Sequence, residues 1–170
     1  VVDRDECVRP ESTMETLGRL PTAFEPDGVC TAGNSSPMSD GAGAVVLMDR
    51  ETAEKKGLEP LAVFRGFAVT GCDPSIMGIG PVEAIRKVLR KTGLTLEEMD
   101  LIELNEAFAT QSIACIRELG LDMDKVNVNG GALALGHPLA GTGAILTAKL
   151  LYELKRRRAR YGLVAFCMAG

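Results

Sequence analysis

The sequence predicts a layered α/β fold, and two observations indicate it. Short apolar runs that fit strands alternate along the chain with longer segments whose apolar residues recur at helical spacing. Glycines and prolines stand at the ends of most of these segments, where turns and helix termini favour them. At 170 residues the chain is long enough for one domain, or for one domain and part of another.

The N-terminal part of the chain is predicted to contain two strands and one short helix. Residues 1–36 show little periodicity and are interrupted by prolines and glycines, so we expect loop. Residues 41–48 form a short apolar run, small and then β-branched, that is typical of a buried strand. Asp49 can cap a brief helix over residues 50–56. The run over residues 61–70 is the longest strand candidate.

The rest of the chain alternates between the two kinds of element. Pro81 suits the first turn of a helix, and Gly93 suits its end. The predicted helices cover residues 81–92, 96–99, 108–119 and 141–157, and the predicted strands cover residues 101–104, 126–128 and 162–167. In α/β domains of this kind, ligands gather at strand ends, where loops meet helix N-termini. Polar motifs that directly follow these strands are therefore candidates for a site.

Composition excludes several classes of protein. The apolar share of 46 % and the charged share of 25 % are ordinary for a globular protein. The net charge of −4 argues against nucleic acid as the main partner. No apolar run is long enough for a transmembrane span, and no signal-peptide pattern opens the chain. The chain begins with Val1 rather than Met, so we expect a piece of a longer protein.

The cysteines indicate a reducing compartment. All five lack C-x-x-C spacing, and only one histidine is available to complete a metal site. We therefore expect free thiols, no metal centre and a cytoplasmic location.

His137 is the only histidine, and it stands in a Gly-His-Pro triplet just ahead of the longest predicted helix. A lone histidine is more often structural than catalytic. Here glycines surround it, which lets the backbone approach a ligand closely. An imidazole on such a loop can donate a hydrogen bond or move a proton near neutral pH, so His137 is a candidate for catalysis.

Two further polar residues stand at the ends of predicted strands. Cys167 ends the last strand and enters a turn of small residues. A free cysteine there is either a small buried apolar residue or a thiol placed for chemistry. Asn105 follows the strand over residues 101–104 and opens the next helix. It can cap that helix, and its side chain could also position a water.

Five blocks of the sequence resemble, in order, those of thiolases. Three of the blocks carry the polar residues just described, and the resemblance covers essentially the whole chain. The blocks are residues 31–36 (TAGNSS) with Asp40 and Gly41, residues 75–81 (SIMGIGP), residues 105–109 (NEAFA), residues 129–138 (NGGALALGHP) and Cys167.

The resemblance implies the layered αβαβα fold of thiolases. For this chain it implies the C-terminal half, with a mixed five-stranded sheet and helices on both faces. Residues 1–58 would complete the N-terminal thiolase domain and supply a loop segment. Residues 59–170 would form the C-terminal thiolase domain, truncated after the turn at Cys167. The family's nucleophilic cysteine would lie in an N-terminal half outside this sequence.

The resemblance also implies the roles of the catalytic residues. His137 and a water held by Asn105 would form an oxyanion hole for an enolate-like charge. Cys167 would be the acid/base that exchanges the α-proton or the thiol proton of CoA. The backbone N–H of Ala169 would belong to a second oxyanion hole, around the acyl-enzyme thioester.

Three residues would bind substrate by the same resemblance. Ser36 would touch the pantetheine arm, and Met77 and Phe108 would wall the acyl pocket. Acyl-CoA and CoA would be substrates, and no metal or redox cofactor is implied. The protein partners implied are the N-terminal half of the same thiolase and further copies in a homodimer or homotetramer.

The implied function is that of an acyl-CoA acyltransferase of fatty acid metabolism, which catalyses reversible Claisen condensation and thiolysis of 3-ketoacyl-CoA. The isolated chain is expected to be inactive. A non-catalytic thiolase-like protein that binds acyl-CoA or lipid is the alternative, although the presence of Asn105, His137 and Cys167 together favours catalysis. Ketoacyl-synthase enzymes share the fold, but they normally use two histidines in this half, and this chain has one.

Overall fold

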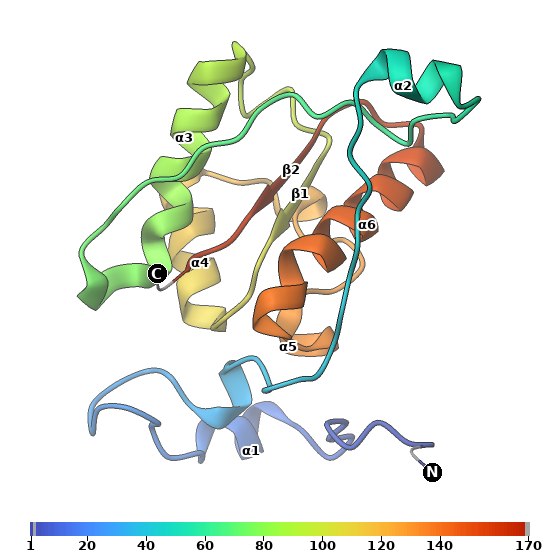
Figure 1. The fold of residues 1–170 in the computed structure, drawn as a ribbon. Coiled ribbons are helices and arrows are strands. Elements are labelled where there is room, and N and C mark those ends of the chain that lie inside the picture. Colours follow the sequence, from blue (N-terminus) through green and yellow to red (C-terminus); the bar gives the residue numbers. More distant parts are fainter. Residues whose placement is uncertain (2, 169–170) are drawn as a thin grey trace.

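A two-stranded parallel sheet lies at the centre of the molecule (Figure 1). The computed structural model describes residue 1 and residues 3–168. Strand β1 (Leu101–Leu104) pairs with strand β2 (Gly162–Ala165) in register from end to end. Because parallel strands end at the same edge of a sheet, the residues that follow β1 and β2 come together there.

Three predicted helices form the layers around the sheet. Helix α3 (Gly80–Thr92) is terminated by Gly93, which follows its last residue. Helix α4 (Ala109–Leu119) is terminated in the same way by Gly120, and both ends are as predicted. Helix α6 (Leu139–Arg157) is the longest and leads back to β2. The connection from β1 to β2 thus runs through α4 and α6, as in other parallel α/β units.

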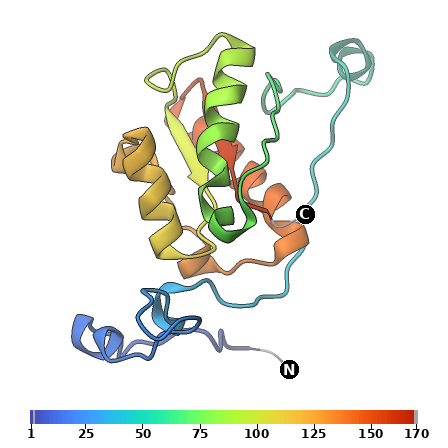
Figure 2. The same cartoon turned by 90° about the vertical axis from the view of Figure 1, so that its left-hand side faces the viewer.

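Helices cover both faces of the sheet, as predicted. Side chains alternate between the faces along a strand, so Ile102 and Leu104 pack with α3 and α4, whereas Leu101 packs with α6. Figure 2 shows α3 and α4 on one side of the strands and α6 on the other. The larger core cluster consists of Val82, Ile85, Met99, Ile102, Leu104, Cys115, Leu121, Val126, Leu163 and Ala165.

The other elements are short. Helix α2 (Arg50–Lys55) is capped as predicted, because the Asp49 carboxylate accepts a hydrogen bond from the backbone N–H of Thr52 at 2.8 Å. The rest are helix α1 (Met14–Gly18), helix α5 (Ala132–Leu135) and the 3₁₀ helices η1 (Ala32–Asn34), η2 (Pro74–Ile79) and η3 (Met123–Lys125). In the described part of the chain, no helix combines the length and apolar character needed to cross a membrane.

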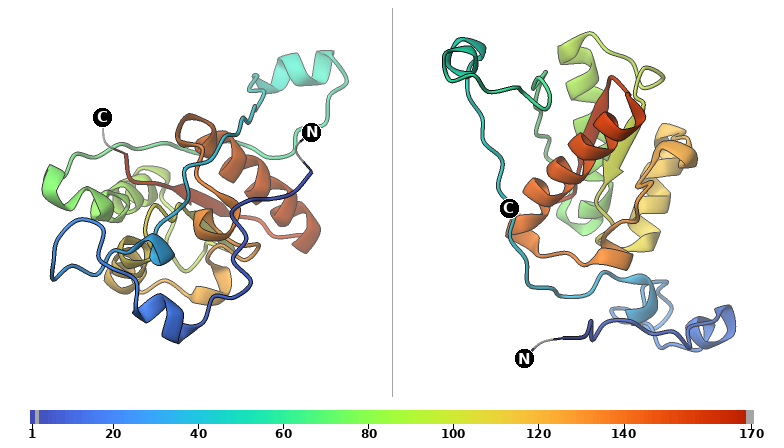
Figure 3. Two further views of the ribbon diagram at one scale, coloured as in Figure 1. Left: turned by 90° about the horizontal axis from the view of Figure 1, so that it is seen from below. Right: turned by 90° about the vertical axis from the view of Figure 1, so that its right-hand side faces the viewer.

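Two predicted strands are absent, so the prediction of a five-stranded sheet is wrong for the described residues. Residues 41–48 and 61–70 run as extended chain outside the layers (Figure 3). A strand needs a second backbone alongside it to take up its N–H and C=O groups, and no such neighbour lies beside either segment in the described residues. Their exposed apolar side chains are Val45, Val46, Leu47, Met48, Leu61, Val63, Phe64, Phe67 and Val69.

The strand predicted over residues 126–128 is reduced to a single bridge between Val126 and Ile102. Asn127 has a left-handed φ of 47°, and its side chain takes the place of strand backbone. Its Nδ2 donates to the Leu104 carbonyl at 2.7 Å, and its Oδ1 accepts from the Leu104 N–H at 2.9 Å. The amide therefore completes the pairing of β1 where the backbone turns away.

One predicted helix is absent, and one strand is shorter than predicted. Residues 96–99 form a turn rather than a helix, although Glu98 Oε2 accepts a hydrogen bond from the backbone N–H of Thr95 at 2.8 Å. Strand β2 ends at Ala165, slightly earlier than predicted, because its neighbour β1 ends at the residue opposite, Leu104.

Candidate functional site

Asn105 and His137 meet at the carboxyl edge of the sheet. Asn105 directly follows β1, and its backbone N–H donates to the Ala165 carbonyl at 2.9 Å, which fixes it beside the end of β2. Its side chain is fully buried, and Nδ2 lies 3.2 Å from His137 Nε2. The two residues are separate candidates by their place in the sequence, and the resemblance assigns them to one oxyanion hole. The fold brings their side chains into contact.

His137 is held between helices α5 and α6. Gly136 before it has a φ of 96°, which other residues rarely adopt, and a β-carbon there would also collide with Ser39. The Nδ1 atom of His137 lies 2.7 Å from Thr142 Oγ1 in the first turn of α6, and this hydroxyl can donate to it. Partial burial lowers the pKa of His137 below its ordinary 6.5, and the ring is therefore neutral at pH 7.

Glu106 supports the segment that leads to His137. We call residues 129–136, which include α5, the glycine loop. One carboxylate oxygen of Glu106 accepts from Asn127 Nδ2 at 2.7 Å, and the other accepts from the backbone N–H of Leu133 at 3.1 Å. Glu106 thus holds the chain just before the glycine loop, through Asn127, and the middle of the loop, through Leu133.

A segment from the N-terminal part of the chain runs past both motifs. A backbone bridge joins Ser35 to Phe108, and another joins Met38 to His137. Between these bridges, the backbone N–H of Ser36 donates at 3.0 Å to the carbonyl of the residue before Phe108. Two of the predicted substrate-binding residues, Ser36 and Phe108, therefore lie beside the contact between Asn105 and His137.

Helix α4 positions the predicted acyl-pocket residues. Met77 lies in η2, which packs against α4, where the Cys115 thiol donates to the Gly78 carbonyl at 3.4 Å. Phe108 directly precedes α4, and its ring meets that of Phe24 edge to face with centroids 5.8 Å apart. The side chains of Met77 and Phe108 are both partly buried.

Cys167 lies just beyond β2, at the same edge of the sheet as Asn105. It is partly buried, and burial raises the pKa of its thiol above the ordinary 9.0, so the thiol is protonated at neutral pH. Among the described residues, no hydrogen bond joins this thiol to Asn105 or His137. Ala169, which was predicted to belong to the same turn, lies outside the described residues.

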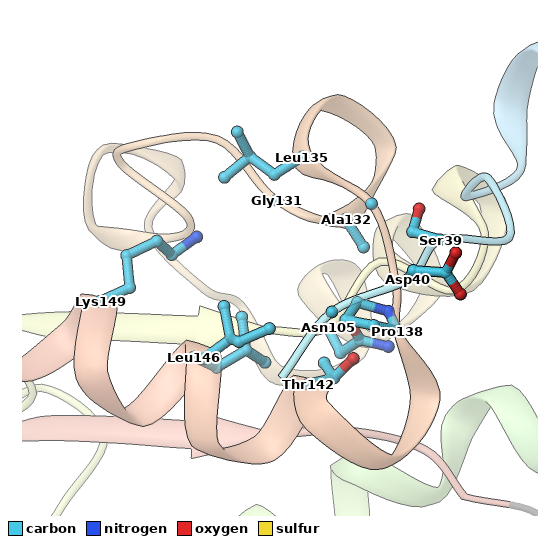
Figure 4. Close-up of a pocket in the computed structure, with 13 residues that line it drawn as sticks. Ser39, Asp40, Asn105, Gly131, Ala132, Leu135, Pro138, Thr142, Leu146 and Lys149 are labelled. Atoms are coloured by element: carbon cyan, nitrogen blue, oxygen red, sulfur yellow. The ribbon is translucent and has the colours of Figure 1, made fainter. Parts of the chain in front are cut away.

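A cavity of about 110 Å³ lies between the glycine loop and α6 (Figure 4). Asn105 forms part of its wall, and the Oδ1 atom of this residue is buried without a hydrogen-bond partner in the described part of the chain. A cavity of this size has room for water that could pair with the amide. Lys149 reaches into it from α6. The lining residues are Ser39, Asp40, Gly41, Asn105, Gly131, Ala132, Leu135, Gly136, Pro138, Thr142, Ile145, Leu146 and Lys149.

Three residues at the site were not predicted: Thr142, Asn127 and Lys149. Thr142 is the only polar residue in a short Gly-Thr-Gly run near His137, and a single hydroxyl so close to a candidate imidazole is a usable signal. Lys149 lies two helical turns after Thr142, on the same partly buried face of the helix. A charged side chain on such a face requires a partner, which is a signal that the sequence carries. The role of Asn127 depends on its backbone conformation, for which the sequence carries only the general tolerance of asparagine for left-handed angles.

Family models and known proteins identify what the chain resembles. "Thiolase, C-terminal domain" matches residues 58–170, and "Thiolase, N-terminal domain" matches residues 1–51. The 3-ketoacyl-CoA thiolase of Bacillus subtilis is 58 % identical over 100 % of this chain and 44 % of its own length. The acetyl-CoA acetyltransferase of Chromobacterium violaceum is 51 % identical over 99 % of this chain and 43 % of its own length.

A solved structure gives the same result in three dimensions. The crystal structure of human mitochondrial 3-ketoacyl-CoA thiolase in complex with CoA matches with a TM-score of 0.93 and 52 % identity, over 98 % of this chain and 42 % of that chain. The chain spans about two fifths of the length of the relatives it matches. The division into domains at residue 58 stays a prediction. Because one family model covers more than half of the sequence, the chain belongs to the thiolase family.

Proposed function

We propose that this chain is the C-terminal half of an acyl-CoA acyltransferase that catalyses reversible Claisen condensation and thiolysis of 3-ketoacyl-CoA. The observation that carries the proposal is the contact between the buried Asn105 and His137 at the carboxyl edge of the sheet. The names of two relatives, 3-ketoacyl-CoA thiolase and acetyl-CoA acetyltransferase, support the same reaction.

The nucleophilic cysteine belongs, in this proposal, to an N-terminal half outside this sequence. The chain matches 44 % of the Bacillus subtilis relative, and its match to the N-terminal domain is confined to residues 1–51. Cys115 is fully buried in the core, where an acyl-CoA cannot reach it. The isolated chain is therefore expected to be inactive.

The proposed oxyanion hole uses the Nε2 edge of His137. Removal of the α-proton from an acyl-CoA places negative charge on the thioester oxygen, and N–H donors aimed at that oxygen stabilise it. A neutral imidazole carries one proton, and its position depends on the partner of the other nitrogen. When the Thr142 hydroxyl donates to Nδ1, the proton lies on Nε2. The Asn105 amide nitrogen beside Nε2 is itself a donor and cannot accept this proton, so the N–H can be donated to the thioester oxygen. A water held by Asn105 would be the second donor.

Cys167 is the proposed acid/base at the α-carbon. In thiolysis the nucleophilic cysteine attacks the 3-keto carbon, the carbon–carbon bond breaks, and acetyl-CoA leaves as its enolate. The Cys167 thiol gives its proton to the α-carbon of that enolate, and in condensation the thiolate takes the proton back. The raised pKa keeps the proton on the sulfur until the enolate forms. The N–H of Ala169 is proposed as the donor to the acyl-enzyme thioester.

Acyl-CoA and CoA are the proposed ligands. Ser36, beside the catalytic contact, would touch the pantetheine arm, and Met77 and Phe108 would wall the acyl group. The reaction moves only acyl groups and protons, so CoA thioesters serve as substrates and we propose no further cofactor. The N-terminal half, and copies of the complete protein in a dimer or tetramer, are the proposed protein partners.

Incubation of the complete protein with acetoacetyl-CoA tests the proposed function. We expect acetoacetyl-CoA to be consumed, and acetyl-CoA to form, only when free CoA is also present. The alternative, a non-catalytic protein that binds acyl-CoA or lipid, would bind acetoacetyl-CoA and leave it intact. That result would overturn the proposal.

Thr142→Val in the complete protein is expected to lower kcat for this thiolysis by roughly 10- to 100-fold, as when a functional histidine loses the partner that orients it. Valine has the shape of threonine but no hydroxyl, so Nδ1 of His137 loses its hydrogen bond. Thr142→Ser should retain activity. Thr147→Val is the matched control, since the Thr147 hydroxyl donates only to a carbonyl of its own helix at 2.7 Å. An unchanged kcat in Thr142→Val would contradict this role.

A further inference from the structure

Lys149 joins three elements of the site through one ammonium group. It lies on α6, two turns after Thr142, and its Nζ is 2.7 Å from Glu103 Oε2 on β1. The same Nζ donates to the carbonyl of Gly130 in the glycine loop. The pair is buried, with side chains 16 % exposed for Lys149 and 2 % for Glu103. Figure 4 shows Lys149 extending from α6 toward the glycine loop.

The contact lies next to the catalytic pair. Asn105 directly follows β1, two residues after Glu103, and its backbone still pairs with Ala165, so the two side chains point to the same face of the sheet, toward α6. The glycine loop starts near Gly130 and leads to His137, whose ring is bonded to Thr142 of α6. Helix α6 therefore holds this segment at both ends, through Lys149 at the start and through Thr142 at the finish.

The ion pair between Lys149 and Glu103 is better suited to fixing the geometry of the site than to stabilising the fold. A buried ion pair generally contributes no more stability than apolar side chains of the same volume, because desolvation offsets the attraction. Burial raises the pKa of Glu103, and the hydrogen bond and charge of Lys149 act in the opposite direction. What an apolar side chain would lack is the hydrogen bond that Lys149 Nζ donates to the Gly130 carbonyl, since a hydrogen bond fixes both distance and angle.

We propose that Lys149 is a positioning residue of the thiolase reaction. Its ammonium group fixes the distance between the glycine loop and β1. This distance brings His137 Nε2 into contact with Asn105. It touches no reacting atom and acts through Gly130 and the loop. The kinetic consequence rests on the proposed function, whereas the anchoring of the loop does not.

The test compares four variants of the complete protein. Lys149→Met keeps the length of the side chain and removes its charge, and a double variant adds Glu103→Gln to remove the carboxylate left without a partner. Lys149→Arg is the conservative variant. Lys55→Met is the matched control, because Lys55 forms an exposed ion pair with Glu51 on α2.

We expect Lys149→Met and the double variant to lower kcat for acetoacetyl-CoA thiolysis by roughly 10- to 100-fold, the usual effect of a small misplacement of a catalytic group. KM should change little, Lys149→Arg should recover most of the loss, and Lys55→Met should behave as the unsubstituted protein. If Lys149 served only to neutralise Glu103, the double variant would regain both Tm and kcat. Positioning predicts that it regains Tm alone. An unchanged kcat in Lys149→Met, or a restored kcat in the double variant, would overturn the inference.

Hydrogen exchange of the backbone amides of residues 129–136 gives a readout that needs no turnover. We expect faster exchange in Lys149→Met and in the double variant, and no change in Lys55→Met. Equal exchange in all of them would overturn the inference. An absence of turnover in the unsubstituted protein would count against the proposed function alone, because the exchange experiment would still decide whether Lys149 anchors the loop.

Discussion

His137→Ala in the complete protein is expected to lower kcat for acetoacetyl-CoA thiolysis by about 100- to 1,000-fold, the usual cost of losing one oxyanion-hole donor. The ring is a neutral donor because burial lowers its pKa, and its Nε2 edge faces Asn105. CoA affinity should change little, since the proposed contact of the ring is with the reacting thioester oxygen. Steady-state kinetics and calorimetric titration with CoA measure the two effects separately.

The companion variant Asn105→Ala sharpens this prediction. Because both groups act on one oxyanion, the double variant should lose less activity than the product of the two single losses. Unchanged turnover in His137→Ala would remove His137 from the mechanism.

Cys167→Ser is expected to lower thiolysis by roughly 100- to 10,000-fold, the range for a lost general acid/base. Serine is similar in size to cysteine but a far weaker acid, so the fold should persist while proton transfer to the enolate fails. Cys7→Ser, on the exposed N-terminal segment, is the matched control. Nearly normal turnover in Cys167→Ser would contradict the assigned role.

The pH profile of the unsubstituted protein extends this prediction. Burial raises the pKa of Cys167 above 9.0, so the acid form persists through neutral pH, and the alkaline fall in kcat for thiolysis should have its midpoint above pH 9.0. Burial lowers the pKa of His137 below 6.5, so on the acid side the neutral ring should persist as the pH falls through 6.5. An alkaline fall with its midpoint below pH 9.0 would contradict a buried thiol, and an acid fall with its midpoint at pH 6.5 or above would contradict a neutral ring.

The layered part of the fold could be predicted because its elements carry local signals. Helix α3 has a proline in its first turn and ends at Gly93, and β1 is an apolar run interrupted only by Glu103. Residues 41–48 and 61–70 carry the same kind of apolar signal, yet they form no strand. Strand formation depends on a neighbouring backbone, which is often distant in the sequence, and a local pattern does not report whether that neighbour is present.

The resemblance predicts that Asn105 and His137 share an oxyanion hole, but the contacts that build the site were not predicted. Asn105 and His137 are 32 residues apart, and their meeting depends on the parallel pairing of β1 with β2. Lys149 is visible in the sequence as a charge on an amphipathic helix, but Glu103 and Gly130 become its partners only when three elements are packed together. Side-chain networks of this kind follow from tertiary structure, which periodicity does not encode.

The most direct test of this account is acetoacetyl-CoA thiolysis with added CoA, measured on this chain alone, on the N-terminal half of its parent protein alone and on a mixture of the two. The account predicts activity only in the mixture, because this chain supplies Asn105, His137 and Cys167 and the other half supplies the nucleophile. Activity of this chain alone would contradict the division of the active site between the halves. Inactivity of a mixture that associates and binds CoA would contradict the proposed catalysis.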